Sequence, residues 1–304
     1  MRSRIADKLI LTNENGSSVE FSVKSVFHTN ISKDVSGLSD VDNEIYSTSG
    51  INQAGATYLG YHIASRDIEI VGHINELDKA IVREYRHQIN HVLNPAYSCV
   101  LTYQHEEYKR QIKCKVNSAP HFDMDGILQR FTINLLCLNP YWMDETETHT
   151  QIATWIGGME FDSVNGLQLT NSADDPQWEV GYRLPNLITN IENSGDATTG
   201  LTITFTAQGS VSNPGLIDAK TQEYIQVNID MLAGEEITIK TGYGEKSVTF
   251  KNQSGEVSDI FRYLDIGSTY LQLAIGDNPY RYYAESGEDN LNVTIKHSNL
   301  YLGV

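Results

Sequence analysis

Apolar and polar residues alternate in short runs through the first half of the chain, the pattern of strands with one buried face. The first two runs flank the turn-rich tip Asn13–Ser18, which predicts a β-hairpin. In the last run Ile68, Ile70 and Gly72 share one face, so we expect a half-buried strand there. The alternating runs are 9–12, 19–23, 58–64 and 66–74.

Between Thr29 and Gly60 the alternation is lost, and the segment is rich in Ser, Asp, Asn and Gly. This composition predicts a long loop. Long ordered loops in compact domains usually contact something, so we expect this loop to reach a partner.

One amphipathic helix is predicted after the strand at 66–74. Asn75 can cap it, and Asn94-Pro95 ends it because proline disfavours a helical residue before it. Its apolar positions recur every three to four residues: Leu77, Ile81, Tyr85, Ile89 and Val92/Leu93.

The stretch from Tyr97 to Asp144 holds three further strand-like runs, at 98–103, 108–116 and 127–138. The third is almost continuously apolar, which predicts a central strand or one covered on both faces. Asn139-Pro140 ends it, and we expect Tyr141 and Trp142 to pack back against the sheet or against a neighbour.

The second half of the chain predicts a separate all-β domain. Residues 145–185 carry closely spaced turn signals, namely Gly157-Gly158, Asn165-Gly166 and Asp174-Asp175-Pro176. Regularly spaced strand-like runs then indicate a β-sandwich: 201–205, 225–229, 236–240, 248–250, 271–275 and 291–295. We therefore expect a mainly β protein with one notable helix, divided into an N-terminal domain of β-sheet or split barrel (1–145), a connector (146–185) and a sandwich (186–304).

Composition narrows the function. The formal net charge is −17, and the first 150 residues hold 14 basic against 19 acidic residues, so the second half is the more acidic. An acidic surface does not grip nucleic acid, because phosphate neutralisation needs clustered Lys and Arg. Neither a signal peptide nor a run of roughly 18 apolar residues is present, so we expect cytoplasmic synthesis and no membrane insertion.

Cysteines and histidines offer weak candidates for metal binding. Cys99, Cys114 and Cys137 are too widely spaced for a disulfide framework or a zinc knuckle, and we expect buried thiols. His87 and His91 share a helix face, but the metalloprotease pattern has Glu where Gln88 stands. Exposed imidazoles are the plainer interpretation, and we expect no metal and no cofactor.

No catalytic constellation stands out, and we expect no enzyme. Gly242–Ser247 resembles a phosphate loop but has Glu245 where only backbone fits, and Asp123–Gly126 lacks the later ligands of a calcium loop. Lys113 and Lys115, with Gln111, form one polar face of a strand. We expect this face to contact solvent or an acidic partner. The acidic doublets Asp174/Asp175, Glu235/Glu236 and Glu288/Asp289 lie in turn-like contexts, where solvation is the default.

One aromatic cluster leaves a sugar-binding alternative open. Tyr280, Arg281, Tyr282 and Tyr283 lie beside Asp277 and Asn278, which can hydrogen-bond hydroxyl groups. The cluster suits either ligand contact or packing within the sheet. The alternative function is thus a carbohydrate-binding β-sandwich module acting in host-surface adhesion.

Taken in order, the strand, the helix ending in Leu93-Asn94-Pro95, the hairpin and the run from Phe131 to Trp142 resemble the distal tail protein (Dit) family of siphophages. The second half is similar to the galectin-like domain of that family at Asn193–Asp196, Gly234–Ile239, Tyr263–Gly267 and Tyr301–Gly303. The galactoside-binding His, Asn, Arg and Trp set of true galectins is missing.

The resemblance implies a structural protein of the phage tail tip. It implies a hexameric ring, with N-terminal domains forming a belt around a channel through which DNA passes without specific binding. The implied partners are the major tail tube protein, the tail-associated lysin or tip protein, and in some phages receptor-binding proteins. The implied location is the virion tail tip, after assembly in the host cytoplasm.

Overall fold

A computed structural model describes residues 7–125, 128–152, 155–157, 159–162, 166–169, 181–183 and 188–304. The chain forms two compact units. The first runs to Thr146 and also takes in Leu300–Val304, and the second is Glu147–Asn299. These units differ from the expected 1–145, 146–185 and 186–304, because residues 300–304 pack with the first unit and the strand at Thr148–Gln151 pairs within the second.

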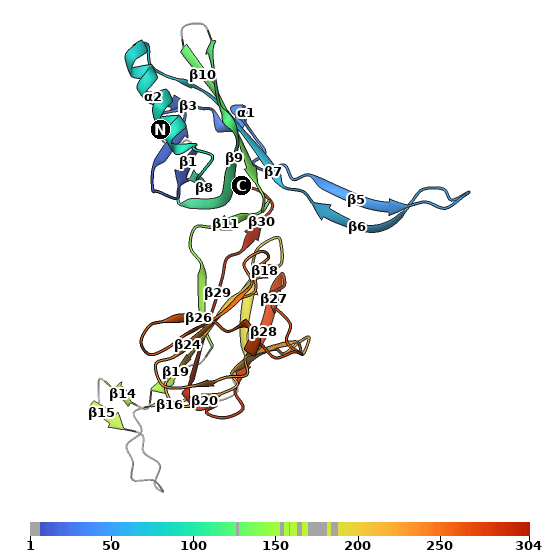
Figure 1. The fold of residues 1–304 in the computed structure, drawn as a ribbon, viewed down its shortest axis with the longest axis vertical. Helices are drawn as coiled ribbons and strands as arrows, with labels where there is room; N and C mark the ends of the chain where they lie inside the picture. Colours follow the sequence, from blue (N-terminus) through green and yellow to red (C-terminus); the bar gives the residue numbers. More distant parts are fainter. Residues whose placement is uncertain are drawn as a thin grey trace. The chain divides into compact units, whose positions relative to one another are not determined.

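The first unit is built on a closed β-barrel (Figure 1). β2 and β3 pair in parallel, whereas its other pairs are antiparallel. The barrel closes because β9 pairs with both β8 and β10. Around the barrel the strands are β10 (Leu128–Cys137), β7 (Arg66–Ile74), β3 (Phe27–His28), β2 (Ser18–Ser22), β1 (Lys8–Asn13), β8 (Cys99–His105) and β9 (Tyr108–Asp125).

Alternate residues of these strands fill the barrel interior. The predicted hairpin of β1 and β2 is confirmed, with Leu9 opposite Phe21 and both fully buried. Phe21 packs against Phe131 with 5.6 Å between ring centroids. Burying a side chain of this size contributes about 1.5–3 kcal/mol, so this alternation is the main source of the unit's stability.

β10 is not covered on both faces. Its buried residues alternate strictly with half-buried or exposed ones, and Leu138, just beyond its end, is 73% exposed. Of the two predicted alternatives, the central strand is observed, because β10 pairs with β7 on one side and β9 on the other. One face fills the barrel and the other is partly exposed. Ile127, where the run was expected to begin, lies outside the described residues.

The predicted helix is α2 (Lys79–Val92), and it begins later than expected. Asp78, rather than Asn75, is the N-cap, and its side chain accepts a hydrogen bond from the Ala80 N–H at 2.8 Å. Ile89 and Val92 are buried against the barrel, whereas the first expected apolar position, Leu77, is 67% exposed. Tyr85 is half-buried and packs on Phe27, with 5.7 Å between the ring centroids, so the amphipathic stripe was predicted correctly from Tyr85 onward.

The expected long loop at 29–60 is wrong for half of its length. The segment contains helix α1 (Ile31–Asp34) and the strands β4 (Val35–Ser36) and β5 (Asn43–Thr48), and β5 pairs with β6 (Thr57–Ile63). Every residue of β5 is exposed. A strand without a buried face carries no apolar alternation, which is why the sequence pattern did not reveal it.

Trp142 packs inside the first unit. It starts β11 (Trp142–Asp144), is fully buried and donates its indole N–H to the Leu38 carbonyl at 2.9 Å. β11 pairs on one side with β9 and on the other with β30 (Leu300–Tyr301). Of the two expected environments for Trp142, the sheet of its own unit is the observed one.

The second unit contains two facing antiparallel sheets of a β-sandwich. Six strands form one sheet, in the order β12 (Thr148–Gln151), β29 (Leu291–His297), β19 (Thr202–Ala207), β24 (Glu236–Lys240), β25 (Ser247–Lys251) and β26 (Val257–Asp259). Four form the other: β17 (Thr189–Asn193), β28 (Gly276–Tyr283), β21 (Gly215–Asp218) and β22 (Tyr224–Gln226). A mainly β fold of a barrel-like domain and a sandwich, as expected from the sequence, is confirmed.

Shorter pairs complete this unit. They are β13 (Trp155–Gly157) with β16 (Gly181–Arg183), β14 (Met159–Asp162) with β15 (Gly166–Leu169), β18 (Thr199–Gly200) with β27 (Gln272–Leu273), and β20 (Val211–Ser212) with β23 (Asp230–Met231). Two 3-10 turns lie at Phe261–Tyr263 and Glu288–Asn290. The expected turns at Gly157-Gly158, Asn165-Gly166 and Asp174–Pro176 fall wholly or partly outside the described residues.

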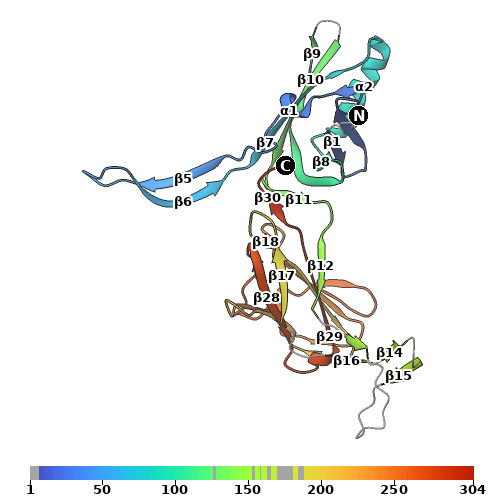
Figure 2. The ribbon, with the colours of Figure 1, turned by 180° about the vertical axis from the view of Figure 1, so that it is seen from behind.

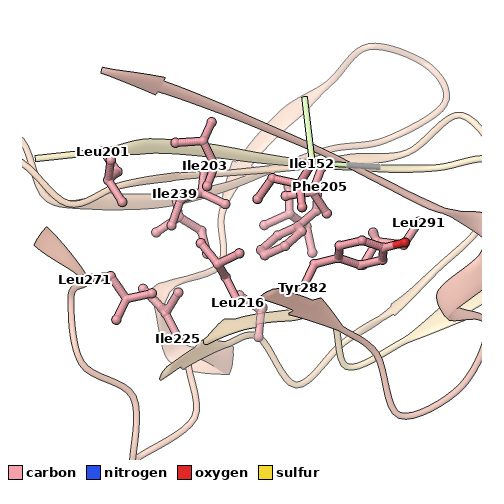
Figure 3. Packing of buried hydrophobic residues seen from close by; sticks show 14 of the residues in the cluster. Ile152, Leu201, Ile203, Phe205, Leu216, Ile225, Ile239, Leu271, Tyr282 and Leu291 are labelled. Atoms are coloured by element: carbon pink, nitrogen blue, oxygen red, sulfur yellow. The ribbon is translucent and has the colours of Figure 1, made fainter. Parts of the chain in front are cut away.

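The sandwich core lies between its two sheets. Figure 3 shows Ile203, Phe205 and Ile239 from the six-stranded sheet lying toward Leu216 and Tyr282 from the four-stranded one. Each of these side chains is at most 1% exposed. The strand predicted at 236–240 matches β24, whereas β28 was not predicted because its apolar positions are tyrosines among polar neighbours.

A carboxylate fixes one turn of the sandwich and gives it a pH dependence. Asp265 accepts hydrogen bonds from the Tyr224 hydroxyl at 2.9 Å, the Asn228 amide at 3.2 Å and the Gly267 N–H at 3.0 Å. These donors, Tyr224 first, lower the pKa of Asp265 below its ordinary 3.8. The ionised form is thus favoured in the folded state, and its stabilisation is present above a pH of about 4 and lost as the pH falls through the lowered pKa.

We therefore expect the Gly267 amide to exchange faster with solvent as the pH falls below about 4, after correction for intrinsic exchange rates. Hydrogen exchange followed by NMR measures this. Asp265→Asn should give fast exchange at every pH. A Gly267 amide equally protected across this range in the unmodified protein would contradict the assignment.

Candidate interaction surface

The hairpin of β5 and β6, residues 43–63, projects from the barrel unit as a two-stranded ribbon (Figures 1 and 2). Ile45 lies directly opposite Tyr61, and Leu59 is the extra residue where the register shifts after Tyr46. Neither strand pairs with any other described strand. Both outer edges of the ribbon therefore present unpaired backbone N–H and C=O groups.

The 43–63 hairpin exposes a large apolar surface. All its large apolar side chains except Ile63 are more than half exposed: Ile45 65%, Tyr46 52%, Ile51 98%, Tyr58 60%, Leu59 66% and Tyr61 62%. A lone two-stranded hairpin is at best marginally stable in water. Exposed apolar patches on such a scaffold mark sites of protein association.

Charge is sparse on this hairpin. Glu44 is its one carboxylate, and it contains neither Lys nor Arg. The Tyr46 hydroxyl donates to Glu44 at 3.2 Å, and this hydrogen bond raises the pKa of Tyr46. The surface suits a partner that buries apolar side chains and pairs with strand edges.

Arg66, three residues after β6, anchors the base of the hairpin. Its side chain is buried, and its guanidinium donates to four backbone carbonyls: Pro140 at 2.8 Å, Gly37 at 2.8 Å, Leu38 at 2.9 Å and Leu302 at 2.5 Å. Burial lowers the pKa of Arg66. The hydrogen-bond acceptors named here are all backbone carbonyls, and sequence patterns do not reveal such partners.

Gly37 permits the close approach behind this anchor. It has a positive φ of 81°, and a Cβ placed there would lie 2.0 Å from the Asp67 carbonyl oxygen. Only glycine fits this position without moving β7. The segment before the hairpin is therefore fixed in place by Gly37, Arg66 and the Trp142 indole.

The predicted candidates for chemistry do not form a site in the described part of the chain. His87 and His91 are exposed on α2 and line a shallow groove with Ile81, Glu84, Tyr85 and Gln88. The described residues contain no group of three or more side chains that could hold a metal ion. In Asp123–Gly126, Gly126 is not described.

The acidic and glycine-rich candidates have structural roles. Glu235 accepts a hydrogen bond from the Leu232 N–H at 2.7 Å within a turn, and Glu236 accepts one from Thr238. Gly242–Ser247 connects β24 to β25, and the Lys246 ammonium lies 4.7 Å from the Tyr270 ring centroid. Asp174/Asp175 lie outside the described residues.

The aromatic cluster is interior rather than a binding face. Tyr280 and Tyr282 are at most 1% exposed and belong to the sandwich core, while Asn278 is 3% exposed and donates to the Ala274 and Gly276 carbonyls. Burial raises the pKa of Tyr283 to about 12. Of the two interpretations, packing within the sheet is observed, and substitution of Tyr282 would probe stability rather than sugar binding.

Lys113 and Lys115 lie on the exposed face of β9, as predicted, and the three cysteines are free and buried, also as predicted. The run predicted at 58–64 matches β6, but sequence patterns missed β5 and its pairing with β6, the Arg66 anchor and the pairing of β30. A signal for the hairpin was nevertheless present in the tyrosines and isoleucines within a segment otherwise too polar to form a core.

No helix among the described residues is long and apolar enough to span a bilayer.

Two family models match the chain. Residues 15–137 match a phage tail protein RIFT-related domain, and residues 194–301 match a siphovirus-type tail component, C-terminal domain. The first match falls within the barrel unit and the second within the sandwich and β30. Among curated proteins, none matches this chain.

Solved structures of phage tail components have a similar fold. The crystal structure of the Dit protein of phage SPP1, described as a hub adsorption apparatus in phages that infect Gram-positive bacteria, shares 16% identity with a TM-score of 0.66, covering 96% of this chain and 98% of that chain. The baseplate of phage p2 in its activated conformation is also similar. Its calcium form gives 12% identity and a TM-score of 0.47, and its strontium form 13% and 0.49, each covering 97% of this chain and 98% of that chain.

Proposed function

Since this chain belongs to the siphophage distal tail protein family and is a structural component of the phage tail, we propose that it assembles into a hexameric ring at the tail tip through its 43–63 hairpin. In this proposal the barrel units form the belt of the ring, and each hairpin packs on the neighbouring copy. The ring joins the major tail tube protein to the tail-associated lysin or tip protein.

The exposed apolar surface of the hairpin is the observation that supports this proposal most directly. Five of its side chains, all except Tyr46, are at least 60% exposed, on a ribbon with two open edges. Both features are unfavourable for a free monomer. Packing of the hairpin on a second copy of the chain would bury its apolar side chains and pair its strand edges with that copy.

The acidic balance of the barrel half, with 14 basic against 19 acidic residues in the first 150, fits a conduit for DNA. A channel lined by carboxylates repels phosphates, so DNA slides through without being held. We propose that the ring surrounds such a channel, that it assembles in the host cytoplasm, and that the sandwich unit carries receptor-binding proteins in the mature virion. The second unit holds most of the acidic excess, which favours partners with basic surfaces.

Charged substitutions in the hairpin are expected to prevent ring assembly. Ile45 and Tyr61 lie opposite each other on one face, so Ile45→Asp or Tyr61→Asp places a carboxylate in the proposed interface. Burying an unpaired carboxylate costs several kcal/mol, which corresponds to at least about 100-fold weaker association per contact. Native mass spectrometry of the full chain measures the proportion of hexamer.

Ile266→Asp is the matched control, because Ile266 is fully exposed on the sandwich unit. It introduces the same charge without touching the hairpin, and its hexamer fraction should equal that of the unmodified chain. Circular dichroism should show all three variants folded. Hexamers that persist in both hairpin variants would place the contact elsewhere, and a native chain that stays monomeric with tail tube protein added would overturn the ring.

A further inference from the structure

Three buried thiols form a row across adjacent strands of the barrel. Cys99 of β8 lies directly opposite Cys114 of β9. On the other side of β9, Leu136 lies opposite Lys115, so the next rung of the ladder places Cys137 of β10 opposite Cys114. The three are 1%, 4% and 0% exposed, respectively, and all are free.

The two cross-strand pairs in this row are not equivalent. The two-residue turn Glu106-Glu107 makes His105 and Tyr108 a hydrogen-bonded pair, and hydrogen-bonded and open pairs alternate along the ladder. By that alternation Cys99 and Cys114 are again a hydrogen-bonded pair. In an antiparallel sheet the N–H and C=O of one residue point toward the same neighbouring strand. Those of Cys114 point toward Cys99, so Cys114 and Cys137 form a non-hydrogen-bonded pair, in which the side chains lie closer.

The side chains agree with this pairing, since Cys137 is the neighbour that contributes most to the raised pKa of the Cys114 thiol. Across an open pair the Cβ atoms lie about 4.5–5.5 Å apart, against about 3.5–4.5 Å in a disulfide. A small inward shift of two neighbouring strands is enough to close that gap.

Of these two residues, Cys114 borders a groove and Cys137 does not. The groove, of about 530 Å³, is lined by Cys99, Cys114, Lys113, Lys115 and Leu138, among others. Cys137 does not line it. Cys114 is therefore the first thiol of this pair that a small oxidant meets.

We propose that Cys114 and Cys137 are a latent disulfide of the barrel, closed by exchange with a small-molecule disulfide that enters through this groove. The Cys114 thiolate attacks one sulfur of the reagent, forming a mixed disulfide and releasing one small thiolate. The Cys137 thiolate then attacks the Cys114 sulfur and releases the second. Two protons leave the cysteines, and their two electrons reduce the reagent to two thiols.

Burial sets the rate of this reaction. Hydrogen bonding to Cys137 and burial raise the pKa of Cys114, so little thiolate is present at neutral pH. The bond should therefore form slowly at neutral pH and faster as the pH rises. Once formed, it ties β9 to β10 and closes a loop in the unfolded chain, which raises the Tm of the barrel unit by roughly 5–10 °C.

The test uses the full chain incubated with oxidised glutathione at mildly alkaline pH, followed by acid quenching, intact mass spectrometry and non-reducing peptide mapping. The expected product has lost two hydrogen atoms and contains one bond between the Cys114 and Cys137 peptides. Cys99→Ser should form the same bond. Cys137→Ser should stop at a stable glutathione adduct on Cys114.

Three results would overturn the proposal: a Cys99–Cys114 bond, a lasting glutathione adduct on Cys114 of the unmodified chain, or no reaction under conditions in which the unfolded chain oxidises fully. The peptide map of the unmodified chain decides between these without any variant, so a misfolded Cys137→Ser leaves the test intact.

Discussion

Replacing Arg66 with alanine is expected to lower the free energy of unfolding of the barrel unit by about 3 kcal/mol or more. The buried guanidinium donates to the Pro140, Gly37, Leu38 and Leu302 carbonyls. The substitution leaves these acceptors without their donor and opens a cavity where the side chain lay. The Tm of this unit should fall by roughly 10 °C, as followed by differential scanning calorimetry.

Two comparisons separate the anchor from a general effect of lost charge. Arg66→Lys keeps the charge but lacks the planar fork, and it should recover only a minor part of the loss. Arg83→Ala removes an exposed arginine of α2 and should leave the Tm within about 1 °C, because alanine favours helix. If Arg66→Ala and Arg83→Ala have the same Tm, the four hydrogen bonds of Arg66 contribute little to stability.

Joining Thr146 to Leu300 through a single glycine is expected to yield a barrel unit that folds alone. Met143 already lies opposite Leu300 in the ladder of β11 and β30, so the join makes a short hairpin loop. Residues 300–304 bring contacts the barrel otherwise lacks: Arg66 bonds to the Leu302 carbonyl, Arg110 to the Gly303 carbonyl at 2.5 Å, and Ser39 to the Val304 carbonyl at 3.1 Å. The Arg110 guanidinium also stacks on Tyr301, 3.3 Å from its ring centroid.

The matched comparison is a chain that stops at Thr146 and so lacks residues 300–304. Its free energy of unfolding should be lower than that of the rejoined chain by about 3 kcal/mol. The Arg66 and Arg110 guanidiniums each lose one carbonyl acceptor, and β11 loses its pairing with β30. Urea unfolding followed by tryptophan fluorescence reports on the buried Trp142. Equal midpoints for the two chains would mean that β30 is dispensable for the barrel.

Sequence patterns predicted the parts of this fold that have one wet and one buried face. The alternation at 66–74 and 236–240 gave β7 and β24 at their exact or near-exact bounds, since burial imposes a period of two there. The helix was found from its buried C-terminal turns. Its start was misplaced because two polar residues, Asn75 and Asp78, both suit an N-cap, and tertiary packing chose the second.

The candidate interface was only partly predictable. The sequence predicted a partner contact for residues 29–60, which stays a prediction, and a strand at 58–64, which is β6. It did not predict β5, because a strand exposed on both faces has no apolar period. Arg66 gave no signal either, since its partners are backbone carbonyls. Tyr280 and Tyr282 were ambiguous for the opposite reason: tyrosines suit both a sugar-binding face and a sandwich core.

The anchoring of β7 by residues near 300 dictates the order in which the chain can fold during synthesis. Arg66 and its partner Leu302 are 236 positions apart in sequence. A ribosome adds about 5–20 residues per second, so the barrel unit waits roughly 8–30 s for β30 while the whole sandwich is made. The sandwich can thus be complete before the hairpin base is locked, which delays the assembly-competent state until translation has passed Leu302.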